Sequence, residues 1–413
     1  MSEIQVIAGK SRPKSRLLVI GNGMAGLRFL EEITALAAGR FEIIVTGEEP
    51  EAAYNRVLLS PLLAGEITSS DTALKPRAWY AANGIHLHTG SPVTTLDTTS
   101  RCATLANGMT LDYDACVLAT GSEPIRLNVP GANLNGVEVF RTLHDIERLI
   151  APAKRGEPVV VIGGGLLGIE AAYGLQRAGA KVTLVHLMDR LMERQLDAEA
   201  AALLKTTLEA KDITVCLNAE TARITGSAKV EKLVLKDGRE LPASLVVLSV
   251  GIRPRTGLAA AAHPAVRCGI LVNDRMETSV PDVFAIGECA EHNGTVYGLV
   301  EPAYEQARVA ARVLVGEEAS YRGTVMATNL KVSGVPVFSA GDYEGQGGEH
   351  IVWRDGALGH YRKFVIRSER LAGVVLVGDT TDALWYRDLI RDGTSIRSFR
   401  STLAFGRSYA EAA

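Results

Sequence analysis

The chain has 413 residues, of which 47% are hydrophobic and 22% charged, and its formal net charge is −3. This composition is typical of a folded protein of two or three domains and excludes a disordered, collagen-like or coiled-coil chain. The charge balance gives no indication of a nucleic-acid-binding surface. No apolar run is long enough to cross a membrane as a helix, so we expect no membrane association.

The five cysteines are odd in number, widely spaced and without any metal-binding spacing. We therefore expect a reduced, cytoplasmic protein with no protein-ligated metal site.

The first elements in the chain form a β-α-β pattern. A short apolar strand at 17–20 precedes GNGMAG at 21–26, apolar residues then recur at helical spacing up to Leu36, and a second strand covers 41–46. This pattern predicts a parallel sheet.

The same pattern returns about 142 residues later. A strand at 158–162 precedes GGGLLG at 163–168, and a helical stretch at 169–180 leads to a strand at 181–186. Each copy continues into a β-rich stretch with an Asn-Gly or Asp-Gly hairpin signal, at Asn107-Gly108 and Asp237-Gly238. From about residue 325 the pattern changes to antiparallel strands and a helix at 381–393.

We therefore predict an α/β fold with two Rossmann-like dinucleotide-binding domains and a C-terminal α+β domain. Residues 1–125 and 252–324 form the first domain, which is discontinuous, 126–251 form the second, and 325–413 form an interface domain.

The first glycine-rich loop has the spacing G-x-G-x-x-G, with glycines at 21, 23 and 26. The first glycine allows a tight turn, the second lets the backbone approach a pyrophosphate, and the third lets helix and strand pack closely. Met24 and Ala25 then open the helix, whose N-terminus attracts the anion. Glu48 and Glu49 follow the next strand, where a carboxylate accepts hydrogen bonds from a ribose.

The second loop repeats this spacing at Gly163, Gly165 and Gly168, with Leu166 and Leu167 in the helix start. His186 stands where an NAD-specific domain carries an acid, and Arg190 and Arg194 follow it. These arginines either hold a 2′-phosphate or lie on the surface, so the choice between NADH and NADPH stays open. Two dinucleotide sites in one chain indicate a flavoenzyme with FAD in one and NADH or NADPH in the other.

Several further motifs resemble those of flavoproteins with two dinucleotide-binding domains, the glutathione-reductase-like pyridine nucleotide oxidoreductases. These are LATGS at 118–122, FRTLHDIERL at 140–149, VGIRP at 250–254 and TSVPDVFAIGECAEH at 278–292. The resemblance covers about 16–408 and implies that FAD occupies the first domain and the nicotinamide nucleotide the second.

By resemblance, further residues contact the two cofactors. Glu288 stands where the family usually has an aspartate for the ribityl chain, and Glu170 corresponds to an acid near the nicotinamide. Arg56 and Ser60 match a segment near the pyrophosphate, although Pro61 replaces the lysine usually found near the flavin. The other positions carried over are Val93, Ala119, Thr120, Gly121, Arg141, Gly251, Gly287, Glu301 and Pro302.

The flavin's redox partner distinguishes the subclasses of this family. No cysteine occurs in 48–65, where disulfide reductases and peroxidases carry theirs, so a thiol relay there is not expected. Cys289 follows Glu288 directly, and we interpret it as a buried packing residue rather than a relay. No side chain is expected to act as a catalytic base.

The chain is most similar in motif to the flavin domain of assimilatory NAD(P)H-nitrite reductases and to the electron-transfer subunit of assimilatory nitrate reductase. This implies electron transfer from NAD(P)H through FAD to a separate protein with an iron–sulfur, haem or molybdenum centre. A ferredoxin or rubredoxin reductase of another redox chain is the alternative, and a flavin-containing regulatory protein is a third.

Overall fold

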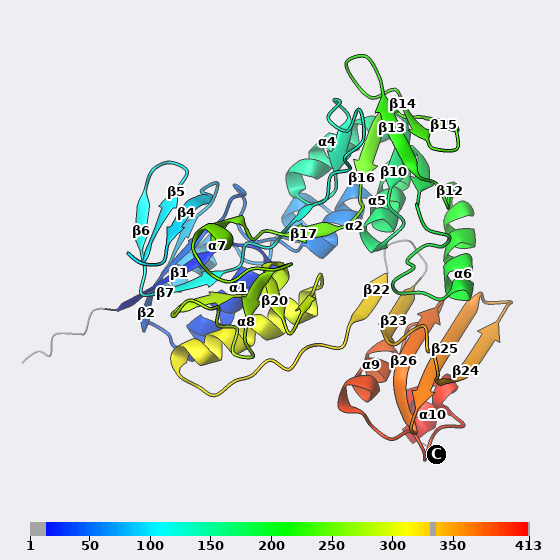
Figure 1. Cartoon of the computed structure of the whole chain (residues 1–413). Helices are drawn as coiled ribbons and strands as arrows, with labels where there is room; N and C mark the ends of the chain where they lie inside the picture. The colour runs from blue at the N-terminus through cyan, green and yellow to red at the C-terminus, as the bar shows by residue number, and fades with distance from the viewer. Residues whose placement is uncertain (1–13, 331–335, 412–413) are drawn as a thin grey trace, which may run out of the picture. The chain divides into compact units, whose positions relative to one another are not determined.

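The computed structural model describes residues 14–330 and 336–411, which form two compact units. The first unit comprises the residues up to Asn55, Ala73–Ser122 and Pro254–Gly323, and the second comprises Arg56–Thr72, Glu123–Arg253 and the residues from Thr324. Figure 1 shows the course of the chain through both.

The first unit is built on a five-stranded parallel sheet in the order β19-β7-β1-β2-β3. The side chains of β1 alternate between two cores, as a strand buried on both faces requires. Leu17 and Val19 pack with helices α1 (Met24–Leu36) and α8 (Val300–Val315), and Leu18 and Ile20 pack with the residues of a β-layer. The sheet comprises β1 (Ser15–Ile20), β2 (Phe41–Thr46), β3 (Ile85–His88), β7 (Ala115–Leu118) and β19 (Val283–Ala285).

Helices cover one face of this sheet and short strands the other (Figure 1). The helices are α1 (Met24–Leu36), α3 (Arg77–Ala82) and α8 (Val300–Val315), with α7 (Gly257–Ala261) beside the β-layer. The β-layer comprises β4 (Val93–Asp97), β5 (Cys102–Leu105), β6 (Thr110–Asp112), β18 (Ile270–Val272), β20 (Ala290–His292) and β21 (Thr295–Val296).

The second unit repeats this design. Its parallel sheet has the order β12-β11-β10-β16-β9, and an antiparallel sheet of β13, β14 and β15 lies within the same unit. The strands are β9 (Val137–Val139), β10 (Pro158–Ile162), β11 (Lys181–Val185), β12 (Thr214–Cys216), β13 (Thr221–Thr225), β14 (Lys232–Leu235), β15 (Glu240–Pro242) and β16 (Leu245–Leu248). The helices are α2 (Leu59–Leu63), α4 (Leu143–Lys154), α5 (Leu166–Arg177) and α6 (Ala198–Glu209).

Residues 56–72 belong to this second unit, whereas the sequence placed them in the first domain. The reason is tertiary packing: helix α2 lies against α5, and a Cβ on Gly174 would come within 3.0 Å of Leu63 Cγ. Two other passages between the units lie in the short strands β8 (Ser122–Pro124) and β17 (Ile252–Pro254).

The C-terminal part of the second unit is an antiparallel sheet in the order β22-β23-β26-β25-β24. Helix α9 (Ala383–Asp392) packs on it through Tyr386 and Leu389. The strands are β22 (Ala327–Leu330), β23 (Val337–Gly341), β24 (Glu349–Asp355), β25 (His360–Arg367) and β26 (Arg370–Val377), and α10 (Arg407–Glu411) follows. The predicted fold class, two dinucleotide-type parallel sheets with an α+β region, is confirmed.

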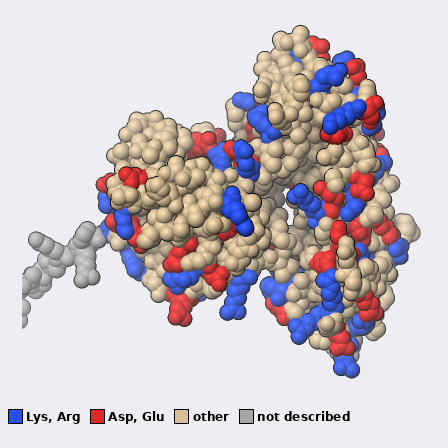
Figure 2. Space-filling view, in the orientation of Figure 1, with Lys and Arg blue, Asp and Glu red and all other residues tan. Residues whose placement is uncertain are grey.

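On the face shown in Figure 2, basic and acidic side chains are interspersed, and neither sign covers a large area. Among the helices of the described residues, none has the length and apolar character that crossing a lipid bilayer requires.

Candidate functional site

The three glycines of the first loop meet two different structural requirements. A Cβ on Gly21, whose φ is +115°, would come within 2.1 Å of the Ala119 carbonyl oxygen, and one on Gly26 within 2.0 Å of the Gly21 oxygen. Around Gly23, by contrast, nothing lies within 4 Å of the added carbon. Gly21 and Gly26 are therefore needed by the fold itself, and Gly23 leaves open space at the start of α1, where Met24 and Ala25 form the first turn.

The same loop holds a polar group whose partner is not a described residue. Nδ2 of Asn22 is buried without a hydrogen-bond partner, while its Oδ1 accepts from the Tyr80 hydroxyl at 3.1 Å. Open space at Gly23, free N–H groups at the helix start and an unpaired amide fit a polar anionic ligand such as a pyrophosphate.

The carboxylates after β2 have partners within the first unit. Glu48 forms an ion pair with Arg255, a residue that sequence reasoning missed because 207 positions separate the two. Glu49 accepts a hydrogen bond of 2.6 Å from the Tyr54 hydroxyl. The Arg255 carbonyl oxygen in turn accepts from the Thr120 hydroxyl at 2.8 Å.

Gly287 places the motif TSVPDVFAIGECAEH beside the first loop. Its φ is +79°, a Cβ on it would come within 2.8 Å of Ala25 Cβ, and its N–H donates to Gln306 Oε1 at 2.7 Å. Glu288 accepts a hydrogen bond of 2.6 Å from the Ser122 hydroxyl. The structure thus gathers the LATGS turn, the Gly287 turn and the start of α1.

The remaining positions predicted for this site are spread through the molecule. Gly121 has a φ of +67° in the LATGS turn, and Val93 begins β4. Glu301 and Pro302 lie in the first turn of α8. Arg56 and Arg141 lie in the second unit, where the Arg56 guanidinium donates to the Arg141 carbonyl oxygen at 2.9 Å.

The second loop reproduces the geometry of the first. A Cβ on Gly163 would come within 2.1 Å of the Ser249 carbonyl oxygen, and one on Gly168 within 1.8 Å of the Gly163 carbonyl oxygen. A Cβ on Gly165 would meet nothing within 4 Å. Gly165 is the N-cap of α5, which Leu166 and Leu167 open. Gly251, with a φ of +116°, lies just beyond β16.

Glu170 is a buried acid in this unit. Its side chain is 7% exposed, and Ser60 Oγ donates to its Oε2 at 3.2 Å. Burial raises the pKa of Glu170 to about 7, although the Ser60 hydrogen bond opposes this shift. The carboxyl group is therefore close to half protonated at neutral pH.

This pKa makes stability depend on pH. Glu170 carries a proton in the folded protein, but not in the unfolded chain, between about pH 4.5 and 7, so the free energy of unfolding falls as pH rises through this window. The difference between the pKa of 4.5 in the unfolded chain and about 7 in the folded protein corresponds to about 3 kcal/mol of unfolding free energy. We expect Glu170→Gln, neutral at every pH, to raise Tm at pH 8.5 and to leave it nearly unchanged at pH 4.5.

Ser60→Ala is the matched control for this prediction. Because the Ser60 hydrogen bond favours the charged carboxylate, its removal should move the midpoint of the pH dependence upward. Equal Tm differences between wild type and Glu170→Gln at both pH values would contradict a buried, neutral Glu170.

The loop after β11 contains a carboxylate that sequence reasoning missed. His186 Nδ1 accepts a hydrogen bond from the Gly164 N–H at 3.0 Å, and its Nε2 lies 3.0 Å from Glu193 Oε2. Arg190 lies near acids, 3.4 Å from Asp189 Oδ1 and 3.8 Å from Glu344 Oε1. Glu193 stands seven positions after His186, and this nearby acid is the signal in the sequence that could have identified it.

Cys289 is a core residue. It is fully buried, and its Sγ lies 3.3 Å from the Ile286 carbonyl oxygen and 3.5 Å from that of Leu118. Burial raises the pKa of its thiol, which disfavours the nucleophilic thiolate. This geometry supports the packing interpretation.

We therefore expect Cys289→Ala to keep its flavin and its electron transfer, with a loss of about 1 kcal/mol of stability. The measurement is NAD(P)H-dependent reduction of ferricyanide and of an iron–sulfur protein, side by side. Loss of both activities with intact flavin reduction would make Cys289 a relay, and Cys289→Ser separates that role from loss of volume.

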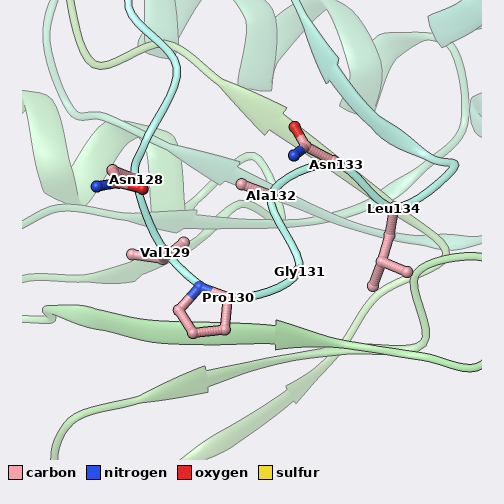
Figure 3. A pocket seen from close by; sticks show the side chains of 7 residues that line it. All are labelled: Asn128, Val129, Pro130, Gly131, Ala132, Asn133 and Leu134. Atoms are coloured by element: carbon pink, nitrogen blue, oxygen red, sulfur yellow. The ribbon is translucent and has the colours of Figure 1, made fainter.

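A surface hollow of about 540 Å³ is lined by one segment, residues 128–134 (Figure 3). None of the predicted site residues is among them, and the segment contributes only Asn128 and Asn133 as polar side chains.

Comparison with known proteins adds the family to this geometry. Residues 15–312 match the model of the pyridine nucleotide-disulphide oxidoreductases, and residues 327–394 match the C-terminal domain of rubredoxin NAD+ reductase. The chain belongs to the pyridine nucleotide-disulphide oxidoreductase family. As a member of this family it is an oxidoreductase that uses FAD and NAD(P)H.

Several curated proteins are similar to most of this chain. The chain is 45% identical to Nitrite reductase [NAD(P)H] and 44% identical to the assimilatory nitrate reductase electron transfer subunit, both from Bacillus subtilis and each over 89% of this chain. It spans about half of these relatives, 46% and 48% of their lengths. The benzene 1,2-dioxygenase system ferredoxin–NAD(+) reductase subunit of Pseudomonas putida is 31% identical over 89% of this chain and 90% of its own length.

Among solved structures, the covalent putidaredoxin reductase–putidaredoxin complex matches 93% of this chain and 95% of that chain. The TM-score is 0.85 at 27% identity.

Proposed function

We propose that the chain is the flavin-containing reductase that passes electrons from NAD(P)H through FAD to a separate metalloprotein in nitrate and nitrite assimilation. The observation that carries this proposal is the pair of loops, each with one glycine left open toward a ligand, at Gly23 and Gly165. We assign the first loop to FAD and the second to the nicotinamide nucleotide. The two B. subtilis relatives support the place in nitrogen metabolism.

The absence of a thiol relay supports direct transfer from the flavin. No cysteine occurs between Glu48 and Gly65, and Cys289 is buried in the core. Bound FAD would supply a group that can accept a hydride from the nicotinamide and pass electrons on one at a time. The five cysteines are all free thiols, which supports a place in the reducing cytoplasm.

The chain's own residues then have positioning roles. The N–H groups at the start of α1 and α5 bind the two pyrophosphates, and Glu48 accepts from the ribose of FAD. Glu288, Thr120 and Gly121 lie with that loop and hold the rest of the cofactor. Glu170 carries a proton part of the time near neutral pH, and no side chain has to remove a proton from a substrate.

Anaerobic mixing tests the proposal. The flavin absorbance should be lost on mixing with NADH or NADPH and should return on addition of ferricyanide. Flavin that stays oxidised with both nucleotides would show that the chain is not a reductase, and would favour the regulatory alternative.

A ferredoxin reductase of another redox chain is the second candidate, because the P. putida relative matches over nearly its full length. Growth on nitrate as the sole nitrogen source separates the two. A strain lacking the chain should fail on nitrate and grow on ammonium if the first proposal holds, and should grow on both if the second does.

A further inference from the structure

An imidazole and a carboxylate lie together at the end of β11. The Gly164 N–H donates to His186 Nδ1 at 3.0 Å, so this nitrogen is the acceptor and Nε2 carries the ring proton. Nε2 therefore donates to Glu193 Oε2, 3.0 Å away. The His186 ring is buried between the glycine loop and the acid, at 8% exposure.

This arrangement supplies the acceptor that the strand end lacks. In a dinucleotide-binding domain, an acid after the second strand accepts hydrogen bonds from the ribose hydroxyls. His186 stands at that position, but its acceptor nitrogen is occupied and its other nitrogen donates. Glu193 carries the free acceptor capacity, and its side chain is 23% exposed, which leaves part of the carboxylate accessible.

The backbone around Glu193 is tied to the same loop. The Met192 N–H donates to the Gly164 carbonyl oxygen at 2.9 Å. A Cβ on Gly164 would come within 2.7 Å of Leu191 Cδ2, so the segment before Glu193 packs directly on the glycine loop. The carboxylate is thereby held beside the loop that we assign to the nicotinamide nucleotide.

Both nearby arginines have acidic neighbours, which would compete with a 2′-phosphate for them. Arg190 is engaged with Asp189, Glu344 and the Leu196 carbonyl oxygen, at 3.4 to 3.8 Å. The Arg194 side chain is 86% exposed, and its Nε lies 4.0 Å from Glu193 Oε1. A phosphate would bring about two negative charges close to Asp189, Glu193 and Glu344.

The C-terminal part of the same unit also contacts this loop. The Tyr343 hydroxyl donates to the Glu193 carbonyl oxygen at 2.9 Å. Lys363, which is buried, donates to the Tyr343 carbonyl oxygen at 3.0 Å and pairs with Asp197 Oδ2 at 3.2 Å. Asp197 also caps α6 and accepts from the Tyr361 hydroxyl at 2.7 Å.

We propose that Glu193, held in place by His186 and Tyr343, accepts from the adenosine ribose of the nicotinamide nucleotide and makes the chain select NADH over NADPH. The inference rests on the proposed function, because it requires the second loop to bind that nucleotide. Glu193 is the specificity-determining residue, and Tyr343 is a positioning residue that acts through it.

Calorimetric titration of the FAD-loaded protein with NAD+ and with NADP+ tests this assignment without turnover. We expect wild type to bind NAD+ at least about tenfold more tightly than NADP+. Glu193→Gln should lose most of this preference, and Glu193→Asp should retain part of it. Tyr343→Phe should lower the affinity for NAD+ and leave the affinity for NADP+ unchanged. Glu240→Gln, the same charge change in an exposed pair with Lys232, is the matched control.

A preference that stays within about twofold of wild type in Glu193→Gln, with intact flavin absorbance and Tm, would overturn the assignment, as would a wild type that prefers NADP+. Should Glu193→Gln fail to fold, Glu193→Asp and Tyr343→Phe give the same decision. A wild type that binds neither nucleotide would overturn both the assignment and the proposed function. Selective NAD+ binding without flavin reduction would overturn the proposed function alone.

Discussion

Gly23→Val is expected to give a folded protein that purifies without FAD. Gly23 has a φ of −86° and a ψ of −167°, which valine adopts freely, and a Cβ there meets nothing within 4 Å. The branched side chain would instead fill the space above the N-terminus of α1, where a pyrophosphate would lie. We expect an affinity loss of about 100-fold, equal to about 2.8 kcal/mol, measured as flavin absorbance per protein.

Two further variants show whether the loss is specific. Gly257→Val, at another open glycine of the same unit, should keep full flavin content. Gly26→Val should instead fail to fold, because its Cβ would overlap the Gly21 carbonyl oxygen. Full flavin content in Gly23→Val would mean that the first loop has been assigned to the wrong ligand.

Local pattern was sufficient to predict much of this fold. The predicted strands 41–46 and 158–162 coincide with β2 and β10, because each is a short run rich in β-branched apolar residues. Both hairpin signals also fall between paired strands, β5 with β6 and β14 with β15. These features depend on the backbone conformations that neighbouring residues prefer, and such preferences can be predicted from the local sequence.

Contacts between distant residues could not be predicted in this way. The pairs Ser60–Glu170 and Glu48–Arg255 join positions 110 and 207 residues apart, and no periodicity encodes such a pairing. Membership of α2 in the second unit likewise depends on the fit of Leu63 against Gly174. Glu193 was missed for a related reason, because a histidine connects the acid to the strand end.

Gly165→Val is expected to separate the two nucleotide sites. Like Gly23, Gly165 has an extended backbone, with φ −80° and ψ −178°, and open space around an added Cβ. The valine would cover the N-terminus of α5 without disturbing the first unit's loop. We expect full flavin content together with a loss of about 100-fold in kcat/KM for NAD(P)H, equal to about 2.8 kcal/mol.

Dithionite reduces flavin directly and needs no nucleotide site, so it serves as the reference reductant. Dithionite should bleach the flavin of Gly165→Val as it does in wild type, whereas NADH and NADPH should not at concentrations that saturate wild type. Gly356→Val, at an open glycine elsewhere in the second unit, should behave as wild type with all three reductants. Flavin reduction by NAD(P)H at the wild-type rate would show that the hydride donor does not bind at the start of α5, since no other change in the variant could restore access to those N–H groups.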